Sequence, residues 1–180
     1  MIEHLSFEVA SFLKKHYERE LPSFAKVKFT IKVLITNTLP ILFLLILSNY
    51  FGQRRDYLLA IISFALLRKF SGGYHSKNAD TCVLITTSTL FIASNFSYVI
   101  SGFSTIITLF SIVLCVCFAP SRILKKTRVK EKYHYIFKIL SVIIVILSLI
   151  IDNSTITLAI FIQSLLLINV NPKKEVKILE

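Results

Sequence analysis

The chain has 180 residues, of which 54% are hydrophobic, and it carries 21 Lys and Arg against 10 Asp and Glu. Its mean hydropathy of +0.71 and its long apolar runs exclude an ordinary soluble domain, which holds roughly 45–50% apolar residues, and predict an integral membrane protein. The net charge of +11 predicts cytoplasmic loops attracted to anionic lipid, and nucleic acid is excluded as a partner because the basic residues flank hydrophobic segments.

Residues 1–22 predict an amphipathic helix that lies at the membrane interface. One helical face is apolar and aromatic, and it comprises Leu5, Val9, Phe12, Leu13 and His16. Charged side chains gather elsewhere, at Glu8, Lys14, Lys15, Glu18 and Arg19. Pro22 should end this helix. We expect no cleaved secretory signal, because no short basic region followed by an apolar core opens the chain.

Six apolar runs follow, measured against the roughly 20 residues that a helix needs to cross a bilayer. Five runs meet or approach this length: Ile31–Tyr50, Cys82–Ser101, Phe103–Ala119, Tyr135–Ile151 and Thr155–Val170. The run Tyr57–Leu67 covers only about 16 Å, or about 21 Å when continued to Phe70. The expected fold is an all-α, polytopic membrane helical bundle of about six segments over residues 31–170, whose short second segment either crosses the membrane or is re-entrant. Residues 1–180 should form one integral membrane domain.

Basic residues in short loops predict the orientation of this bundle. The segment after the run Phe103–Ala119 should be cytoplasmic, because it carries Arg122, Lys125, Lys126, Arg128, Lys130 and Lys132. The tail of residues 171–180 and the loop of residues 68–81 should then face the cytoplasm as well. Arg54 and Arg55 conflict with this orientation, because six membrane crossings would place these two basic residues on the extracellular side. A re-entrant pair formed by the first two segments would remove the conflict.

The stretch RKFSGGYHSKNADTC, residues 68–82, holds a histidine and a cysteine. His75 and Cys82 would lie about 10.5 Å apart on a continuous helix, whereas proton transfer needs a separation near 3 Å. The loop must therefore fold back for the two to meet. Gly72 and Gly73 permit this, because glycine accepts positive φ without a steric cost.

The following helix should begin close to this cysteine. Asn78, Asp80 or Thr81 would cap it, which places Cys82 in its first turn. The positive end of a helix and a nearby imidazolium both favour the thiolate form of a cysteine. The pattern is therefore that of a nucleophile with its own base.

Other interpretations of these residues stay open on spacing alone. A loop histidine near a helix-end cysteine is more often an accident than a catalytic pair. Cys115 and Cys117 lie inside an apolar run, where a thiol usually behaves as a small hydrophobe, and no disulfide framework, metal spacing or cofactor motif is evident. A polar stripe through Thr86, Thr89, Ser94 and Asn95 makes a non-enzymatic peptide exporter the alternative function.

At this loop the sequence resembles the AgrB family, the membrane endopeptidases that process the precursor of a cyclic autoinducing peptide in Gram-positive quorum sensing. The specific part of the resemblance is Arg68, then Gly-Gly-x-His, then a cysteine seven residues later. It implies that His75 and Cys82 are the catalytic pair and that Arg68 and Gly73 support them. KVKFTIKVLITN is similar to the family segment that enters the first crossing helix, with Asn37 on a matching asparagine.

One position departs from the family pattern, which tends to carry Gln or Glu where this chain has Lys32. A third, orienting residue is therefore left open among Asn37, Asp56 and Asp80. Arg68 is expected to pair with a substrate carboxylate or with substrate backbone beside the site.

The resemblance implies a reaction, a substrate and a location. Cys82 would attack a peptide carbonyl with His75 as base, and an internal Cys or Ser of the peptide would displace the thioester as a thiolactone or lactone. The implied partner is an AgrD-like precursor with an amphipathic N-terminus and an acidic C-terminal tail, bound in a Gram-positive cell membrane at a cytoplasmic site. The residues expected to attract that tail are Lys125, Lys126, Arg128, Lys130 and Lys132. Anionic lipid is a second implied partner, and a homo-oligomer is left open.

Overall fold

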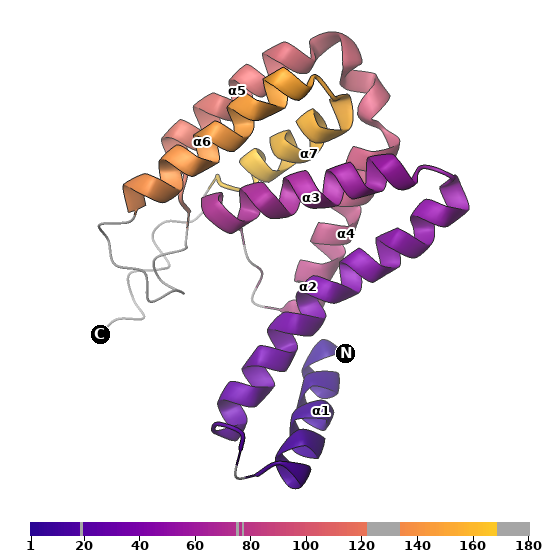
Figure 1. Cartoon of the computed structure of the whole chain (residues 1–180), viewed down its shortest axis with the longest axis vertical. Helices are drawn as coiled ribbons and strands as arrows, with labels where there is room; N and C mark the ends of the chain where they lie inside the picture. The colour runs from indigo at the N-terminus through magenta and orange to yellow at the C-terminus, as the bar shows by residue number, and fades with distance from the viewer. Residues whose placement is uncertain (19, 75, 77, 122–133, 169–180) are drawn as a thin grey trace. The chain divides into compact units, whose positions relative to one another are not determined.

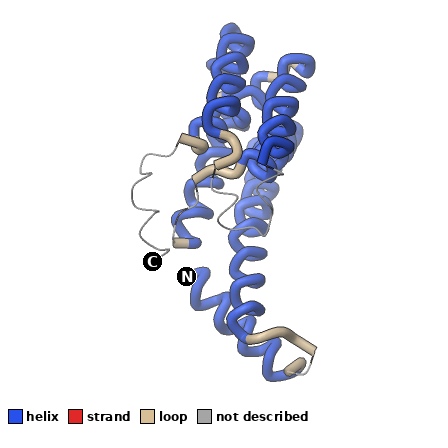
Figure 2. The backbone as a smooth tube through the Cα atoms, turned by 90° about the vertical axis from the view of Figure 1, so that its left-hand side faces the viewer, coloured by secondary structure: helices blue, strands red, loops and turns tan. Residues whose placement is uncertain are grey.

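The computed structural model describes residues 1–18, 20–74, 76, 78–121 and 134–168. Across these residues the regular elements are helices, as Figure 2 shows, and one isolated β-bridge pairs Gly72 with Ser121. The elements, labelled in Figure 1, are α1 (Ile2–His16), α2 (Phe24–Phe51), α3 (Arg54–Ser71), α4 (Ala79–Asn95), the 3-10 helix η1 (Ser97–Phe103), α5 (Ser104–Phe118), α6 (His134–Ile151) and α7 (Ser154–Leu165). The predicted all-α class is confirmed.

The chain divides into two compact units, one formed by Met1–Arg54 with His75–Thr89 and the other by Arg55–Tyr74 with Leu90–Glu180. In the first unit, α1 lies alongside the N-terminal half of α2 (Figure 1). Ala10, Val27 and Ile31 form the buried centre of this contact. The helix predicted for residues 1–22 is present, and it ends at His16, ahead of Pro22.

The face of α1 that packs shares only Leu13 with the apolar stripe seen in the sequence. Its buried residues are Ile2, Ser6 and Ala10, and the two small side chains let the helix backbones approach closely. Leu5 and Phe12 of the predicted stripe are exposed, with 61% of Phe12 accessible. An exposed apolar stripe on a helix that is otherwise charged fits a helix lying in the membrane interface.

In the second unit, α7 packs against α5, α6 and η1 (Figure 1). Four helices contribute to one apolar core. Its buried members are Leu67 of α3, Cys115 of α5, Ala119, Val145 of α6, Ile156 and Ile160 of α7, and Leu167. A short helix at the centre of a core is buried on most sides, which explains why the predicted run over α7 is apolar nearly all round.

Three helical stretches of the described residues are long and apolar enough to cross a membrane: Phe24–Phe51, Ser97–Phe118 and His134–Ile151. The helix α7 is apolar but spans only 12 residues, or about 18 Å. The protein is thus a helical membrane protein. The count of six segments, the single domain over residues 1–180 and the orientation of the bundle stay predictions.

Several predicted boundaries shift for local physical reasons. The short second segment extends over Arg54–Ser71, after Gly52 closes α2 with a left-handed φ of 68°. The run predicted to reach Ser101 leaves the α-helix at Asn95 and continues as η1. The run predicted to reach Val170 leaves α7 at Leu165, and the free carbonyl of Leu166 at this helix end accepts a hydrogen bond from Tyr74 N at 2.7 Å.

Candidate functional site

The turn that follows α3 is built on two glycines. Gly72 and Gly73 have φ of 72° and 121°, in the region that other residues adopt only with strain. A Cβ on Gly73 would lie 3.2 Å from both Gln163 Nε2 and the Leu166 carbonyl oxygen. The two glycines therefore form a turn, in which Gly73 is favoured by its φ and by its close approach to α7, and the predicted fold-back of His75 toward Cys82 stays a prediction.

Backbone hydrogen bonds attach this turn to two distant segments. Ser121 N donates to Ser71 O at 2.8 Å, and Gly73 N donates to Ser121 O at 3.1 Å. Tyr74 N donates to Leu166 O at 2.7 Å. The turn is thus held between the segment after α5 and the end of α7.

Arg68 lies in the last turn of α3 and contacts the same turn. Its Nη2 donates to Tyr74 O at 2.9 Å, its Nη1 donates to Gln163 Oε1 at 3.3 Å, and its guanidinium lies 5.5 Å from the centre of the Phe64 ring. At least two N–H groups of Arg68 therefore form hydrogen bonds within the protein, one of them to the turn itself. The prediction that Arg68 also meets a substrate carboxylate stays a prediction.

Gln163 is a residue of this site that the sequence analysis missed. Its side chain is fully buried, and Nε2 donates to Gly72 O at 2.7 Å and to Ser71 Oγ at 3.3 Å. A strongly polar side chain inside an apolar run was the available signal, because such residues in membrane segments face the protein interior and mark functional sites. Ser121 and Leu166 act through their backbones, so their side chains carried no signal.

Cys82 lies in the first turn of α4, as predicted. Its N–H donates to Asn78 O at 3.2 Å, which makes Asn78 the residue that opens the helix. The thiol is free and the residue is only 7% exposed. His75 lies outside the described residues, so its pairing with Cys82 stays a prediction.

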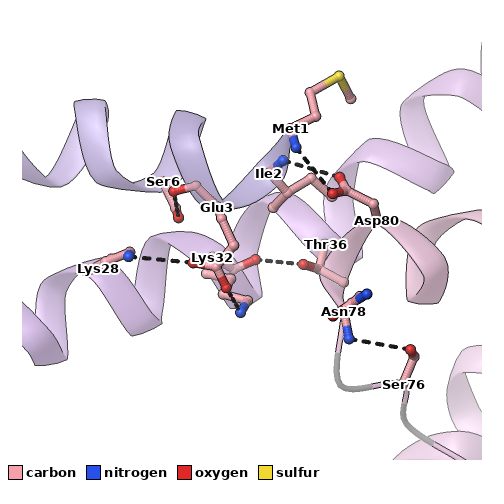
Figure 3. A network of polar contacts seen from close by, with 10 residues as sticks. All are labelled: Met1, Ile2, Glu3, Ser6, Lys28, Lys32, Thr36, Ser76, Asn78 and Asp80. Atoms are coloured by element: carbon pink, nitrogen blue, oxygen red, sulfur yellow. Dashed lines mark hydrogen bonds and ion pairs between the residues drawn. The ribbon is translucent and has the colours of Figure 1, made fainter.

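The carboxylate of Asp80 holds the start of α1 (Figure 3). Met1 N and Ile2 N each donate to it at 3.1 Å. The hydrogen bond from the Ile2 backbone lowers the pKa of Asp80, with further contributions from the positive charges of the Met1 amine and of Lys32. The residue two positions before Cys82 therefore anchors α1, a role that the sequence did not predict for it.

Lys32, the position that departs from the family pattern, pairs with Glu3 of α1 (Figure 3). Lys28 Nζ lies 3.4 Å from the same carboxylate. The hydrogen bond from Lys32 is the main cause that lowers the pKa of Glu3, and Lys28 adds to it. Lys32 thus binds α1 to α2 and is engaged in structure.

The other candidates for the orienting residue, Asn37 and Asp56, lie on different helices. Asn37 is exposed on α2. Asp56 lies in the first turn of α3, twelve residues before Arg68 and so about 18 Å along the helix, and it accepts a hydrogen bond from Thr155 Oγ1 at 3.3 Å. Asp56 therefore lies at the other end of α3 from the glycine turn. The orienting residue stays open.

Other predicted residues lie outside the described parts of the chain or within the core. The basic set Lys125, Lys126, Arg128, Lys130 and Lys132 falls outside the described residues, as do Arg122 and the tail of residues 171–180. Cys115 is fully buried with its Sγ 3.5 Å from Ser164 Oγ, in keeping with a packing role, and Cys117 is exposed.

Comparison with known proteins identifies a family for this chain. The family model described as Accessory gene regulator B, AgrB, matches residues 6–170. A protein of Clostridium acetobutylicum named as AgrB-like is 27% identical over 86 residues, which are 48% of this chain and 41% of that protein. The chain thus matches less than half the length of that relative. No solved structure matches.

The chain belongs to the accessory gene regulator B family, and through that family to quorum sensing.

Proposed function

We propose that this protein is a membrane cysteine endopeptidase that cleaves an autoinducing-peptide precursor and assists its cyclisation. The observation that carries the proposal is the position of Cys82: a free thiol in the first turn of α4, seven residues after His75 in the sequence, in a member of the AgrB family. A cysteine with an imidazole as its base is an activated nucleophile.

The reaction proceeds in two acyl transfers. The Cys82 sulfur attacks the carbonyl at the C-terminal boundary of the signal peptide, while His75 takes the thiol proton and then gives it to the leaving amine. The product is an acyl-enzyme thioester. A Cys or Ser within the bound peptide displaces Cys82 and closes the ring, and the intramolecular reaction outruns hydrolysis because its nucleophile is held nearby.

The substrate in this proposal is an AgrD-like precursor with an amphipathic N-terminal segment and an acidic tail. The exposed apolar stripe of α1 and the basic segment of residues 122–132 are suited to an anionic membrane and to such a peptide. The site would face the cytoplasm of a Gram-positive cell. No cofactor is required, because the nucleophile and the base both belong to the chain.

A co-expression experiment tests the proposal. The protein is expressed with the product of a short neighbouring reading frame that encodes an amphipathic peptide with an acidic tail, and cleavage is followed by mass spectrometry. Cys82→Ala, Cys82→Ser and His75→Ala should abolish cleavage while the protein stays inserted in the membrane. Cys117→Ala is the matched control, because Cys117 is exposed and lies on another helix.

Two results decide between enzyme and carrier. A precursor whose internal nucleophile is replaced by Ala should accumulate as a thioester on Cys82, detected by intact-protein mass. Normal cleavage by the Cys82 or His75 variants would refute the proposal. The exporter alternative rested on a polar stripe in α4, but Ser94 Oγ donates to Leu90 O at 2.8 Å and Asn95 Nδ2 donates to the Tyr57 hydroxyl at 2.8 Å, so the protein itself uses these groups.

A further inference from the structure

We infer that the exposed apolar face of α1 is the surface on which the amphipathic segment of the precursor docks, lying along α1 as a second helix. The inference rests on the proposed function, because it takes the precursor as the substrate. This face, the α1 stripe, comprises Leu5, Val9 and Phe12, which follow one another at helical spacings of four and three residues. All three side chains are exposed.

The contacts of α1 show that it runs antiparallel to α2. Glu3, near the start of α1, pairs with Lys32 (Figure 3). The ring of Phe7, one turn later in α1, lies 5.5 Å from the ring of Phe24, at the very start of α2. Each step toward the C-terminus of α1 is therefore a step toward the N-terminus of α2.

This direction leads the α1 stripe away from the hydrocarbon of the membrane. Lys32 is followed in α2 by the uncharged residues 33–51, which cover about 28 Å, close to the roughly 30 Å of bilayer hydrocarbon. Lys32 thus marks the membrane boundary, and Glu3 lies beside it. From Leu5 to Phe12 the stripe then extends about 10.5 Å farther along the helix. The composition of the stripe fits a membrane interface, but its direction leaves the end at Phe12 to another partner.

The other end of the α1 stripe meets the helix that carries the nucleophile. Asp80, in the first turn of α4, accepts hydrogen bonds from Met1 N and Ile2 N at 3.1 Å each (Figure 3). Cys82 follows Asp80 by two residues, which is less than one helical turn of 5.4 Å. These residues all belong to the first compact unit. A peptide bound along the stripe therefore has one end beside the turn that holds Cys82, and this continuity favours the substrate over lipid or a second copy as the occupant.

The pattern of the α1 stripe matches recognition of another helix. Apolar side chains at spacings of four and three residues form the seam by which amphipathic helices pair or enter grooves. Glu8 and Lys15 border this seam, each three residues after a member of the stripe, Leu5 and Phe12 respectively. Charges at such edges set the register and direction of paired helices. The fitting partner is an amphipathic helix, which the N-terminal segment of the proposed precursor supplies.

Binding of a synthetic peptide tests the inference. The probe is the N-terminal amphipathic segment encoded by the short neighbouring reading frame, made without the cleavage site and with a fluorescent label. The full-length protein is embedded in lipid nanodiscs, and empty nanodiscs of the same lipid measure the binding to lipid alone. Nanodiscs that contain the protein should bind the peptide at least about tenfold more tightly than empty ones, a difference that burial of one apolar side chain suffices to produce.

Substitutions in the α1 stripe should remove this difference. Leu5→Gln and Phe12→Gln should each weaken the protein-dependent binding on the order of tenfold. Phe29→Gln is the matched control and should leave it unchanged. Phe29 is an aromatic residue of the same hairpin, 67% exposed, but it follows Val27, which packs against α1, by two residues and so lies on the opposite side of α2.

Photocrosslinking provides a second measurement that does not depend on polar substitutions. Replacement of Phe12 by p-benzoylphenylalanine keeps an aromatic side chain and should yield an adduct between protein and peptide after irradiation. The same replacement of Phe29 should yield none. This measurement decides the matter if the glutamine variants do not insert into the membrane.

The outcomes separate the docking surface from the proposed function. Equal binding to empty nanodiscs would show that lipid alone takes up the segment, and an adduct at position 12 between two copies of the chain would identify a self-association surface; both overturn the inference. Binding retained by both glutamine variants, without an adduct at position 12, overturns it as well. If cleavage still requires Cys82, the proposed function stands in each of these cases. Peptide bound at the stripe, with cleavage that does not require Cys82, would refute the proposed function and retain the docking surface.

Discussion

Arg68 and Gln163 meet at 3.3 Å across a separation of 95 residues in the chain. The pair closes a ring of contacts with Tyr74 O and Gly72 O. This ring fixes the glycine turn within the second unit.

Substitution of Gly52, Gly73 and Gly102 by Ala should separate the cost of a positive φ from the cost of crowding by the new Cβ. Gly73→Ala should destabilise the protein by roughly 1–3 kcal/mol from its φ alone, with more from the contacts of its Cβ. Gly52→Ala should cost less, because its φ is also positive but nothing lies within 4 Å, and Gly102→Ala should have little effect. Thermal unfolding in detergent measures how much each of the three substitutions destabilises the protein. An equal effect at all three positions would contradict this account of the turn.

The Tyr57 hydroxyl should contribute to the packing of α3 against the end of α4. Tyr57 is fully buried and accepts from Asn95 Nδ2 at 2.8 Å. Tyr57→Phe should cost about 0.5–1.5 kcal/mol of unfolding free energy, and Tyr57→Ala about 3–5 kcal/mol because it also leaves a cavity. Denaturant titration of the two variants measures the difference. If Phe and Ala cost the same, the ring is not packed as described.

The Glu3–Lys32 pair should hold α1 against α2. Glu3→Gln should broaden the distance distribution between spin labels placed at the exposed positions 12 and 29, in a background without native cysteines. Lys32→Gln should broaden it as well, whereas Lys26→Gln, in the same helix, serves as control. Distributions as narrow as in the parent protein would show that apolar contacts alone hold α1.

Acidification should loosen α1 in the same measurement. The pKa values of Glu3 and Asp80 are both lowered in the folded protein, from ordinary values of 4.5 and 3.8. A carboxylate with a lowered folded pKa stabilises the fold above its ordinary pKa and loses that contribution as the pH falls through the folded value. The label distances should therefore be constant near neutral pH and broaden below about pH 4.5. Glu3→Gln with Asp80→Asn should remove the transition.

Salt should weaken precursor cleavage if the basic segment attracts an acidic tail. Raising ionic strength from about 0.1 M to about 1 M shortens the screening length from about 10 Å to about 3 Å. Lys125→Gln with Lys126→Gln should lower cleavage at low salt and reduce its salt dependence. Initial cleavage rates in nanodiscs provide the measurement, and a salt-independent rate would point to apolar docking through α1.

The sequence by itself determined the membrane class, the helical content, the presence of a helix within residues 1–22 and the family. It also determined that a turn separates Arg68 from Cys82, because apolar runs, paired glycines and helix-starting residues are local signals that depend on chain neighbours. The position of Cys82 in the first turn of α4 follows from the same local logic.

Only the tertiary structure decided what surrounds that turn. Gln163, Ser121 and Leu166 reach it from segments far along the chain, Asp80 turned out to hold α1, and Lys32 found its partner in Glu3. The face of α1 that packs carries the small residues Ser6 and Ala10, whereas hydrophobicity alone pointed to the neighbouring face of Leu5, Val9 and Phe12. Such contacts depend on which helices lie side by side. The hydrophobic periodicity of one segment does not specify which other segment packs against it.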